Sequence, residues 1–185
     1  MLKIRKIAAI DIGSNAVRLL ISTITEPKDK PVTFKKTSLV RVPIRLGQDV
    51  FTTGEISNYN QKRMLKTMKA FKLLMECHEI EEYRACATSA MRDANNRNEL
   101  VEVIKEQANI SIEIIDGDDE ASIIAATDLH ALIDKDKNYL YVDVGGGSTE
   151  FTLYVQGKTK ASKSFKIGTV RLLNNGVSDE LWQEA

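Results

Sequence analysis

The sequence predicts an α/β protein of two related lobes, the first holding a mixed five-stranded sheet with helices. Two observations support this fold class. Strand-like runs and helix-like runs alternate along the chain, and a set of three strands occurs twice. In addition, Asp11 and Asp143 each end an apolar run, precede a glycine turn and lead into another strand, 132 residues apart. Such a weak internal repeat predicts two lobes on one plan, a complete one over 1–133 and the beginning of a second over 134–185.

The first lobe is expected to open with three strands. Residues 3–10 are apolar with β-branched members, 17–23 follow across the turn "GSN", and 31–44 come after the polar connection "EPKDK". The stretch "LGQDVFTTGEIS" that follows is expected to form a loop.

Helices and strands then alternate. A helix is predicted from Ser57, a plausible N-cap, because apolar residues recur at helical spacing through Met75. The next elements are expected over the following ranges: a strand over 83–88, a helix over 96–108, a strand over 110–115 and a helix over 118–133. "YLYVDV", "TEFTLYV" and "KTKASKSFKI" are predicted as three strands of the second lobe, followed by the start of a helix.

Bulk composition excludes some classes of partner. The chain has 26 basic and 26 acidic residues among 185, so no general attraction to nucleic acid or anionic membrane is expected. No apolar run approaches membrane-spanning length, and a cytoplasmic protein is expected. Cys77 and Cys86 have no metal-ligand spacing and are expected as reduced core thiols. His78 and His130 have no partner at metal spacing.

The first turn, "DIGSNA", has two interpretations. Gly13, Ser14 and Asn15 are ordinary hairpin residues, so a tight turn explains them. Alternatively, their amides and short polar side chains bind a phosphate.

The second turn, "DVGGGST", repeats this arrangement with more glycine. Gly145, Gly146 and Gly147 would let the backbone approach a ligand, with Ser148 and Thr149 as hydroxyl donors. No G-x-x-x-x-G-K follows, and a strand rather than a helix comes next, so neither a Walker A loop nor a dinucleotide fingerprint is present. Two facing turns can hold a phosphate chain, with Mg²⁺ between Asp11 and Asp143.

Two further segments carry charge that suits phosphate chemistry. Arg92 follows the strand in "CATSAMRDANN", where an α/β sheet places ligand contacts, although a lone arginine is usually a surface residue. In "IIDGDDEASII", the acidic residues 118–120 suit a helix N-terminus. Three carboxylates exceed what a cap needs, and one of them could activate a water.

Together, "AAIDIGSNAVRLLI", "RLGQDVFTTGEIS", "ATSAMRDA", "IEIIDGDDEA" and "VDVGGGSTEF" resemble the exopolyphosphatase and guanosine pentaphosphate phosphohydrolase family. The resemblance runs from about residue 7 to "KIGTVRL" near residue 172. It implies the actin-type ATPase fold, related to ribonuclease H, of the sugar kinase, heat-shock chaperone and actin superfamily. One departure is Asp119, where many members have glutamate. Another is length, because members carry a complete second lobe and often further helical domains.

The resemblance also implies roles for individual residues. Glu120 matches the catalytic glutamate that positions or activates water, and Arg92 matches the arginine that binds the phosphoryl group. Asp143 and Glu150 match acidic residues linked to magnesium. The phosphate-binding positions are matched by the two turns: Gly13, Ser14, Asn15, Gly145, Gly146, Gly147, Ser148 and Thr149.

Three functions follow as alternatives. The leading expectation is a Mg²⁺-dependent hydrolase that releases terminal phosphate from inorganic polyphosphate or guanosine pentaphosphate. A second is an ATP-dependent kinase of the same superfamily, although no adenosine-binding segment is visible. A third is a binding module, or part of a longer protein, without turnover. An unfinished second sheet would leave an apolar face open, which predicts a homodimer through the second lobe.

Overall fold

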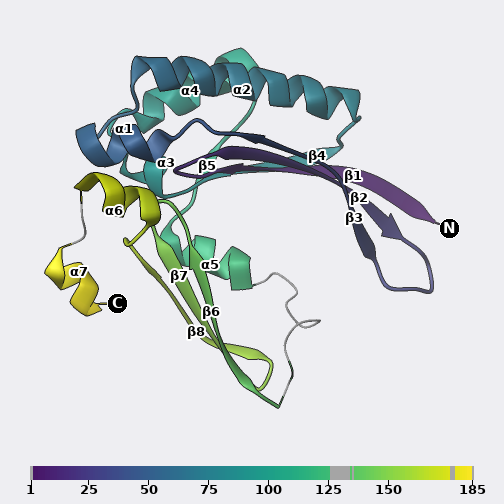
Figure 1. Ribbon diagram of the computed structural model, residues 1–185. Helices are drawn as coiled ribbons and strands as arrows, with labels where there is room; N and C mark the ends of the chain where they lie inside the picture. The colour runs from purple at the N-terminus through teal and green to yellow at the C-terminus, as the bar shows by residue number, and fades with distance from the viewer. Residues whose placement is uncertain (1, 126–133, 135, 176–177, 185) are drawn as a thin grey trace.

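A five-stranded mixed sheet forms the body of the first lobe in the computed structural model, which describes residues 2–125, 134, 136–175 and 178–184 (Figure 1). The strand order is β3-β2-β1-β4-β5, antiparallel between the first three strands and parallel from β1 to β4 and from β4 to β5. The strands are β1 (Lys3–Ile12), β2 (Val17–Glu26), β3 (Thr33–Val42), β4 (Glu82–Ala87) and β5 (Glu113–Ile114). The predicted mixed sheet is confirmed, while the strand expected over 110–115 shortens to two residues.

Two long helices cover one face of this sheet and create the core. In β1, Ile10 and Ile12 are buried while Asp11 between them is only half-buried, because successive side chains point to opposite faces. The buried face packs under α2 (Asn58–Cys77) and α4 (Arg97–Ala108) (Figure 1). Ser57 caps α2 as predicted, since its side chain accepts a hydrogen bond from the Asn60 amide. The opposite face is left for the site.

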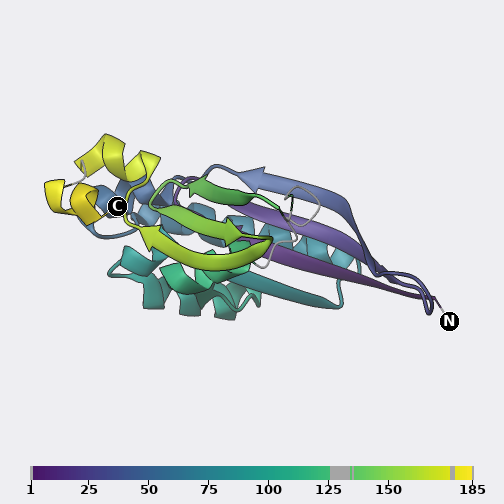
Figure 2. The same cartoon turned by 90° about the horizontal axis from the view of Figure 1, so that it is seen from below.

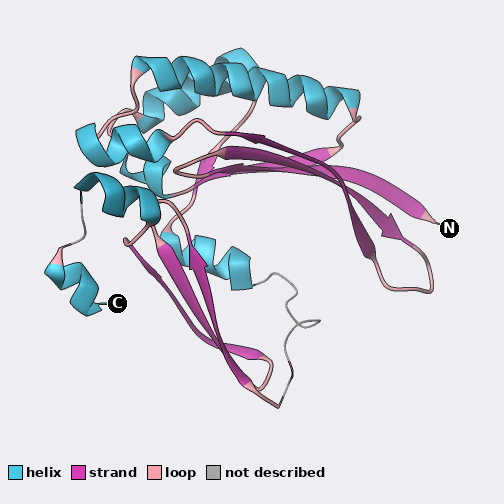
Figure 3. Cartoon of the chain, viewed as in Figure 1, coloured by secondary structure: helices cyan, strands magenta, loops and turns pink. Residues whose placement is uncertain are grey.

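Two short helices were not predicted. α1 (Leu46–Thr53) replaces the loop expected for "LGQDVFTTGEIS", and α3 (Ser89–Asp93) precedes α4. In α1, Leu46, Val50 and Phe51 are buried, so the helix depends on tertiary burial rather than on local propensity. Figure 3 shows these short helices gathered where the first sheet meets the second.

The second sheet is an antiparallel meander, as expected. It consists of β6 (Asn138–Val144), β7 (Thr149–Val155) and β8 (Lys158–Phe165), followed by α6 (Thr169–Asn175) and α7 (Asp179–Glu184). Helix α5 (Gly117–Ala125) joins the lobes and packs on β7 and β8. Of the helix predicted over 118–133, residues 126–133 lie outside the described part. The division of the chain at residue 133 stays a prediction.

The two strand sets repeat in register, which supports the internal repeat. Asp11 pairs with Arg18 across β1 and β2, and Asp143 pairs with Glu150 across β6 and β7, so the paired positions are again 132 residues apart. Figure 2, seen from below, shows the second sheet lying across the open face of the first. The two turns therefore come together at one place.

The cysteines lie outside the core, so the expected burial is wrong. Both are free thiols, but Cys77 is exposed and Cys86 is half-buried. Cys86 belongs to β4 on the face opposite the helices, where Arg84 also lies. Among the described residues, none of the helices has both the length and the apolar character that a membrane span requires.

Truncating the buried Met68 should destabilise the first lobe. Met68→Ala leaves a cavity under α2 and should lower the free energy of unfolding by about 2–5 kcal/mol. Leu73→Ala on the exposed side of the same helix is the matched control and should change it by less than about 0.5 kcal/mol. Urea denaturation measures both, and equal losses would contradict the observed orientation of α2.

Candidate active site

A cleft lies between the open face of the first sheet and the turn of the second. Its volume is about 470 Å³. It contains eleven of the thirteen residues predicted for the site: Asp11, Gly13, Ser14, Asn15, Glu120, Asp143, Gly145, Gly146, Gly147, Ser148 and Glu150. Arg18 and Arg84 add positive charge to the lining, and neither was singled out from the sequence.

The first turn is held by hydrogen bonds of its own backbone and by the start of α1. The Gly13 amide donates to the Ala16 carbonyl at 3.1 Å, which closes the turn. The carbonyls of Ser14 and Asn15 accept from the amides of Gly47 (2.8 Å) and Arg45 (2.9 Å). The tight turn expected for "GSN" is present, and its residues line the cleft, while phosphate binding by them stays a prediction.

The second turn needs glycine because it is crowded. The Gly145 amide donates to the Ser148 carbonyl at 2.9 Å. A methyl group on Gly147 would overlap the Ser89 side chain, and one on Gly146 would lie 3.1 Å from Ser14 Cβ. None of the three glycines has a positive φ, so crowding rather than backbone conformation excludes larger residues. Gly146 and Gly147 lie against the first lobe, whereas a methyl group on Gly145 would lie 3.0 Å from the Ser148 carbonyl oxygen of its own turn.

The hydroxyl groups near the two turns have different environments. Ser14 Oγ and Ser89 Oγ are 2.8 Å apart and buried, so they share a hydrogen bond across the first lobe. Thr149 was predicted to bind phosphate, but it lies outside the cleft lining and its hydroxyl donates to the Ile167 carbonyl. Ser89 stands in "ATSAMRDA", directly after β4, and that position at a strand's end was the signal that could have identified it.

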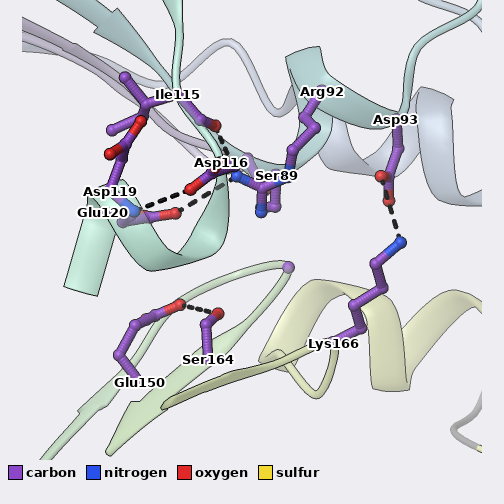
Figure 4. Close-up of polar contacts among 12 residues, drawn as sticks. Ser89, Arg92, Asp93, Ile115, Asp116, Asp119, Glu120, Glu150, Ser164 and Lys166 are labelled. Atoms are coloured by element: carbon purple, nitrogen blue, oxygen red, sulfur yellow. Dashed lines mark hydrogen bonds and ion pairs between the residues drawn. The ribbon is translucent and has the colours of Figure 1, made fainter. Parts of the chain in front are cut away.

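Glu120 projects from the first turn of α5 towards Arg92 (Figure 4). Asp116 begins this turn, since its side chain accepts from the Asp119 amide and its carbonyl accepts from the Glu120 amide. Arg92 Nη1 donates to the Ile115 carbonyl at 2.7 Å and lies 3.8 Å from Glu120 Oε2. Glu120 Oε2 is buried and has no hydrogen-bond partner among the described residues. Its nearest charged neighbour is therefore the Arg92 guanidinium, with which it forms a long ion pair.

The environment of Glu120 favours its protonated form. Burial, together with the negative charges of Glu150, Asp11 and Asp143, raises the pKa of Glu120 to about 7, although the positive charge of Arg92 opposes this shift. Glu150 is itself buried, and its carboxylate accepts a hydrogen bond from Ser164 Oγ at 2.8 Å (Figure 4). The Glu120 carboxyl group therefore titrates near neutral pH.

The acidic residues predicted to bind metal share the cleft without forming a closed cage. Asp11 is held by Arg18 at 2.7 Å, and Asp143 faces Glu150 across adjacent strands. Among the described residues, no three His, Cys, Asp or Glu side chains lie close enough together to hold an ion by themselves. The donor set nevertheless suits Mg²⁺, which usually takes only one or two carboxylates together with waters and substrate phosphates.

Glu120→Gln should change how stability depends on pH. The folded-state pKa of about 7 lies above the ordinary value of 4.5, so the folded chain retains a proton that the unfolded chain releases. The contribution of this proton to the free energy of unfolding is therefore present below about pH 4.5 and is lost as the pH rises towards 7. Relative to wild type, Glu120→Gln should be more stable at pH 8 than at pH 5.

Urea denaturation without metal or ligand measures this difference. Asp119→Asn, at the exposed neighbouring position, is the control and should keep the wild-type pH dependence. A wild-type pH slope in Glu120→Gln would contradict the environment described for this carboxylate.

Known proteins share this sequence and fold. The chain is 36% identical over 170 residues to a bifunctional 3-dehydroquinate synthase/phosphatase of Fusobacterium nucleatum, covering 89% of the chain and 25% of that protein. It is 31% identical to exopolyphosphatase 2 of Mycobacterium tuberculosis, covering 90% and 53%. It is 27% identical to a guanosine-5'-triphosphate,3'-diphosphate pyrophosphatase of Aeromonas hydrophila, covering 96% and 35%. The chain thus spans between a quarter and about half of these relatives.

The fold agrees with solved structures. An exopolyphosphatase from Cytophaga hutchinsonii superimposes with a TM-score of 0.81 at 31% identity, over 91% of this chain and 53% of that one. The expected actin-type α/β fold is thereby confirmed. The model of the Ppx/GppA phosphatase family matches residues 27–185, which hold Arg92, Glu120 and the whole second turn. With most of its length matched, the chain belongs to the Ppx/GppA phosphatase family.

Proposed function

We propose that the chain supplies the phosphate-binding and water-activating site of a Mg²⁺-dependent hydrolase. The reaction would release terminal phosphate from inorganic polyphosphate or guanosine pentaphosphate. The observation that carries this proposal is the largely buried Glu120 beside Arg92, where its Oε2 makes an ion pair but no hydrogen bond among the described residues, at a cleft bounded by two glycine turns. Relatives named for these two substrates support it. A cytoplasmic location, expected from the sequence, belongs to the same proposal.

Phosphate binding would depend on the two turns. Backbone amides and the hydroxyls of Ser14 and Ser148 can donate to phosphate oxygens without bringing net charge. Arg92 supplies the positive charge nearest to Glu120 and would offset charge on the phosphoryl group under attack. The substrate would then lie between the lobes, with its terminal phosphate towards α5.

Glu120 would orient the attacking water and accept its proton. A carboxylate that titrates near pH 7 is well matched to this role, because it is substantially ionised and still basic at neutral pH. In the proposed arrangement, water lies in the cleft beside the Glu120 carboxylate and attacks phosphorus in line with the leaving oxygen.

The metal would be held on the side of the second lobe. Asp143 and Glu150, with Asp11, provide the carboxylates, and the remaining ligands would be waters and phosphate oxygens. Bound there, Mg²⁺ neutralises negative charge on the phosphates. Removal of Mg²⁺ should therefore stop phosphate release.

Glu120→Gln should abolish phosphate release from polyphosphate while binding of polyphosphate stays within about threefold of wild type. The amide keeps the size of the side chain but cannot accept the proton of water. A phosphate-release assay with polyphosphate and guanosine pentaphosphate, each with and without Mg²⁺, measures turnover, and calorimetry measures binding. Asp119→Asn should retain activity.

The outcomes separate the alternatives. If Glu120→Gln lost binding together with turnover, Glu120 would be a binding or structural residue. Binding without turnover in wild type would identify a binding module, which the partial coverage of the relatives makes the second candidate. Tight binding of ATP in place of polyphosphate would favour a kinase.

The second sheet supplies the surface for the proposed homodimer. Leu140 and Leu153 form a cross-strand pair, and with Val142 they present an exposed apolar face. A second copy is the proposed occupant, since this face can pair with itself and the chain has no net charge to oppose association. Size-exclusion chromatography with light scattering should give a dimer that Leu140→Glu dissociates. A monomer at micromolar concentration would contradict the proposal.

A further inference from the structure

The motif "KIGTVRL" has no role in the proposed chemistry, yet it surrounds the second turn. We infer that Arg171 is a positioning residue: its side chain fixes the Gly147–Ser148 peptide group, the last of three that the start of α6 holds, so that the amides of the second turn face the ligand. That the ligand is a phosphate chain rests on the proposed function. The positioning role itself is argued from contacts between the start of α6 and the carbonyls of the three glycines.

Every carbonyl of the three glycines is bound from the same direction. The Thr169 amide donates to the Gly145 carbonyl at 3.0 Å, and the amides of Val170 and Arg171 donate to the Gly146 carbonyl at 2.8 and 3.0 Å. Arg171 Nε donates to the Gly147 carbonyl at 3.0 Å. Three successive peptide groups are therefore fixed by the first turn of α6.

This arrangement determines where the amides point. In a trans peptide group, the N–H of one residue points opposite to the carbonyl of the residue before it, and no cis peptide bond occurs among the described residues. With the carbonyls of 145–147 directed to α6, the amides of Gly146, Gly147 and Ser148 point away from it. None of these three amides has an acceptor within the described part of the chain, and all three residues line the cleft.

Arg171 also contacts the first lobe. Its Nη2 lies 2.6 Å from Asp93 Oδ2, and its guanidinium stacks on the Phe51 ring at 4.1 Å from the ring centre. Asp93 follows Arg92 on α3 and also lies 3.8 Å from Lys166 Nζ (Figure 4). Arg171 is thus a bridge between the second turn and the helix that carries Arg92.

A lysine cannot reproduce this geometry. Lysine at 171 keeps a positive charge for Asp93 but lacks the planar fork that reaches Gly147 and Asp93 together. Asp93→Asn has the opposite effect, because it removes the ion pair and leaves the bond from Arg171 to Gly147. The two variants therefore separate orientation of the turn from attachment between the lobes.

The experiment is a titration of the ¹⁵N-labelled chain with tripolyphosphate, following the amide signals of Gly146, Gly147 and Ser148. In wild type, all three signals should shift on binding. Arg171→Lys should change the chemical shifts of these amides before ligand is added, and should raise the Kd for tripolyphosphate about tenfold. A loss of this size is expected when a hydrogen bond to a charged ligand is weakened. Asp93→Asn should raise Kd less than threefold.

The control is Arg63→Lys, an arginine that also donates to backbone carbonyls and stacks on a ring, but in the first lobe. It should leave the signals of Gly146, Gly147 and Ser148 unchanged before ligand is added. If Arg171→Lys does not fold, Arg171→Gln is measured in the same way.

Several results would overturn the inference. Wild-type signals and Kd in Arg171→Lys would do so, as would equal weakening by Arg171→Lys and Asp93→Asn, since Arg171 would then only join the lobes. If wild type does not respond to tripolyphosphate, the proposed function fails. The inference is then decided by the unliganded spectra, where unchanged signals in Arg171→Lys would refute it.

Discussion

The close approach of the Gly146–Gly147 backbone to the first lobe is the contact on which the site depends. It places a bare peptide chain against Ser14 and Ser89, and no side chain could stand between them. Gly168 shows the same constraint from the other side, because a methyl group there would lie 2.5 Å from the backbone of Gly146 and Gly147. The second turn is thus confined between the start of α6 and the first lobe. This close packing on both sides of the turn fixes its position at the edge of the cleft.

Helix α3 connects the parts of the site. Ser89 at its start contacts Ser14 of the first turn, Arg92 lies near Glu120, and Asp93 binds Arg171 beneath the second turn. These contacts come from one short helix, so its position relates the phosphate-binding turns to the candidate base. Such a helix has little intrinsic stability and takes its position from tertiary contacts, which include the buried Ala90 and Met91.

Much of the fold and of the site could be predicted because its signals are local. Apolar, β-branched runs predicted the strands of both sheets. The Asp-x-Gly turns that begin at Asp11 and Asp143 predicted the two halves of the cleft. Helix α1 was missed because its burial comes from contacts across the chain, and because Gly47, Thr52 and Thr53 have low helix propensity. Arg171 and Ser89 were missed because their partners are distant in sequence. Cys86 was assigned to the core because sequence alone did not show which face of β4 it occupies.

The two copies of the repeat differ in charge beside the cleft. At the position facing the turn aspartate, the first lobe has Arg18 and the second has Glu150. One wall of the cleft therefore carries a neutralised carboxylate, and the other carries two carboxylates side by side. In the proposed mechanism, the cation would therefore lie against the second wall, and a phosphate chain bound to it would have one preferred orientation in the cleft. The difference between Arg18 and Glu150, at corresponding positions of the two hairpins, thus makes the two walls of the cleft different in charge.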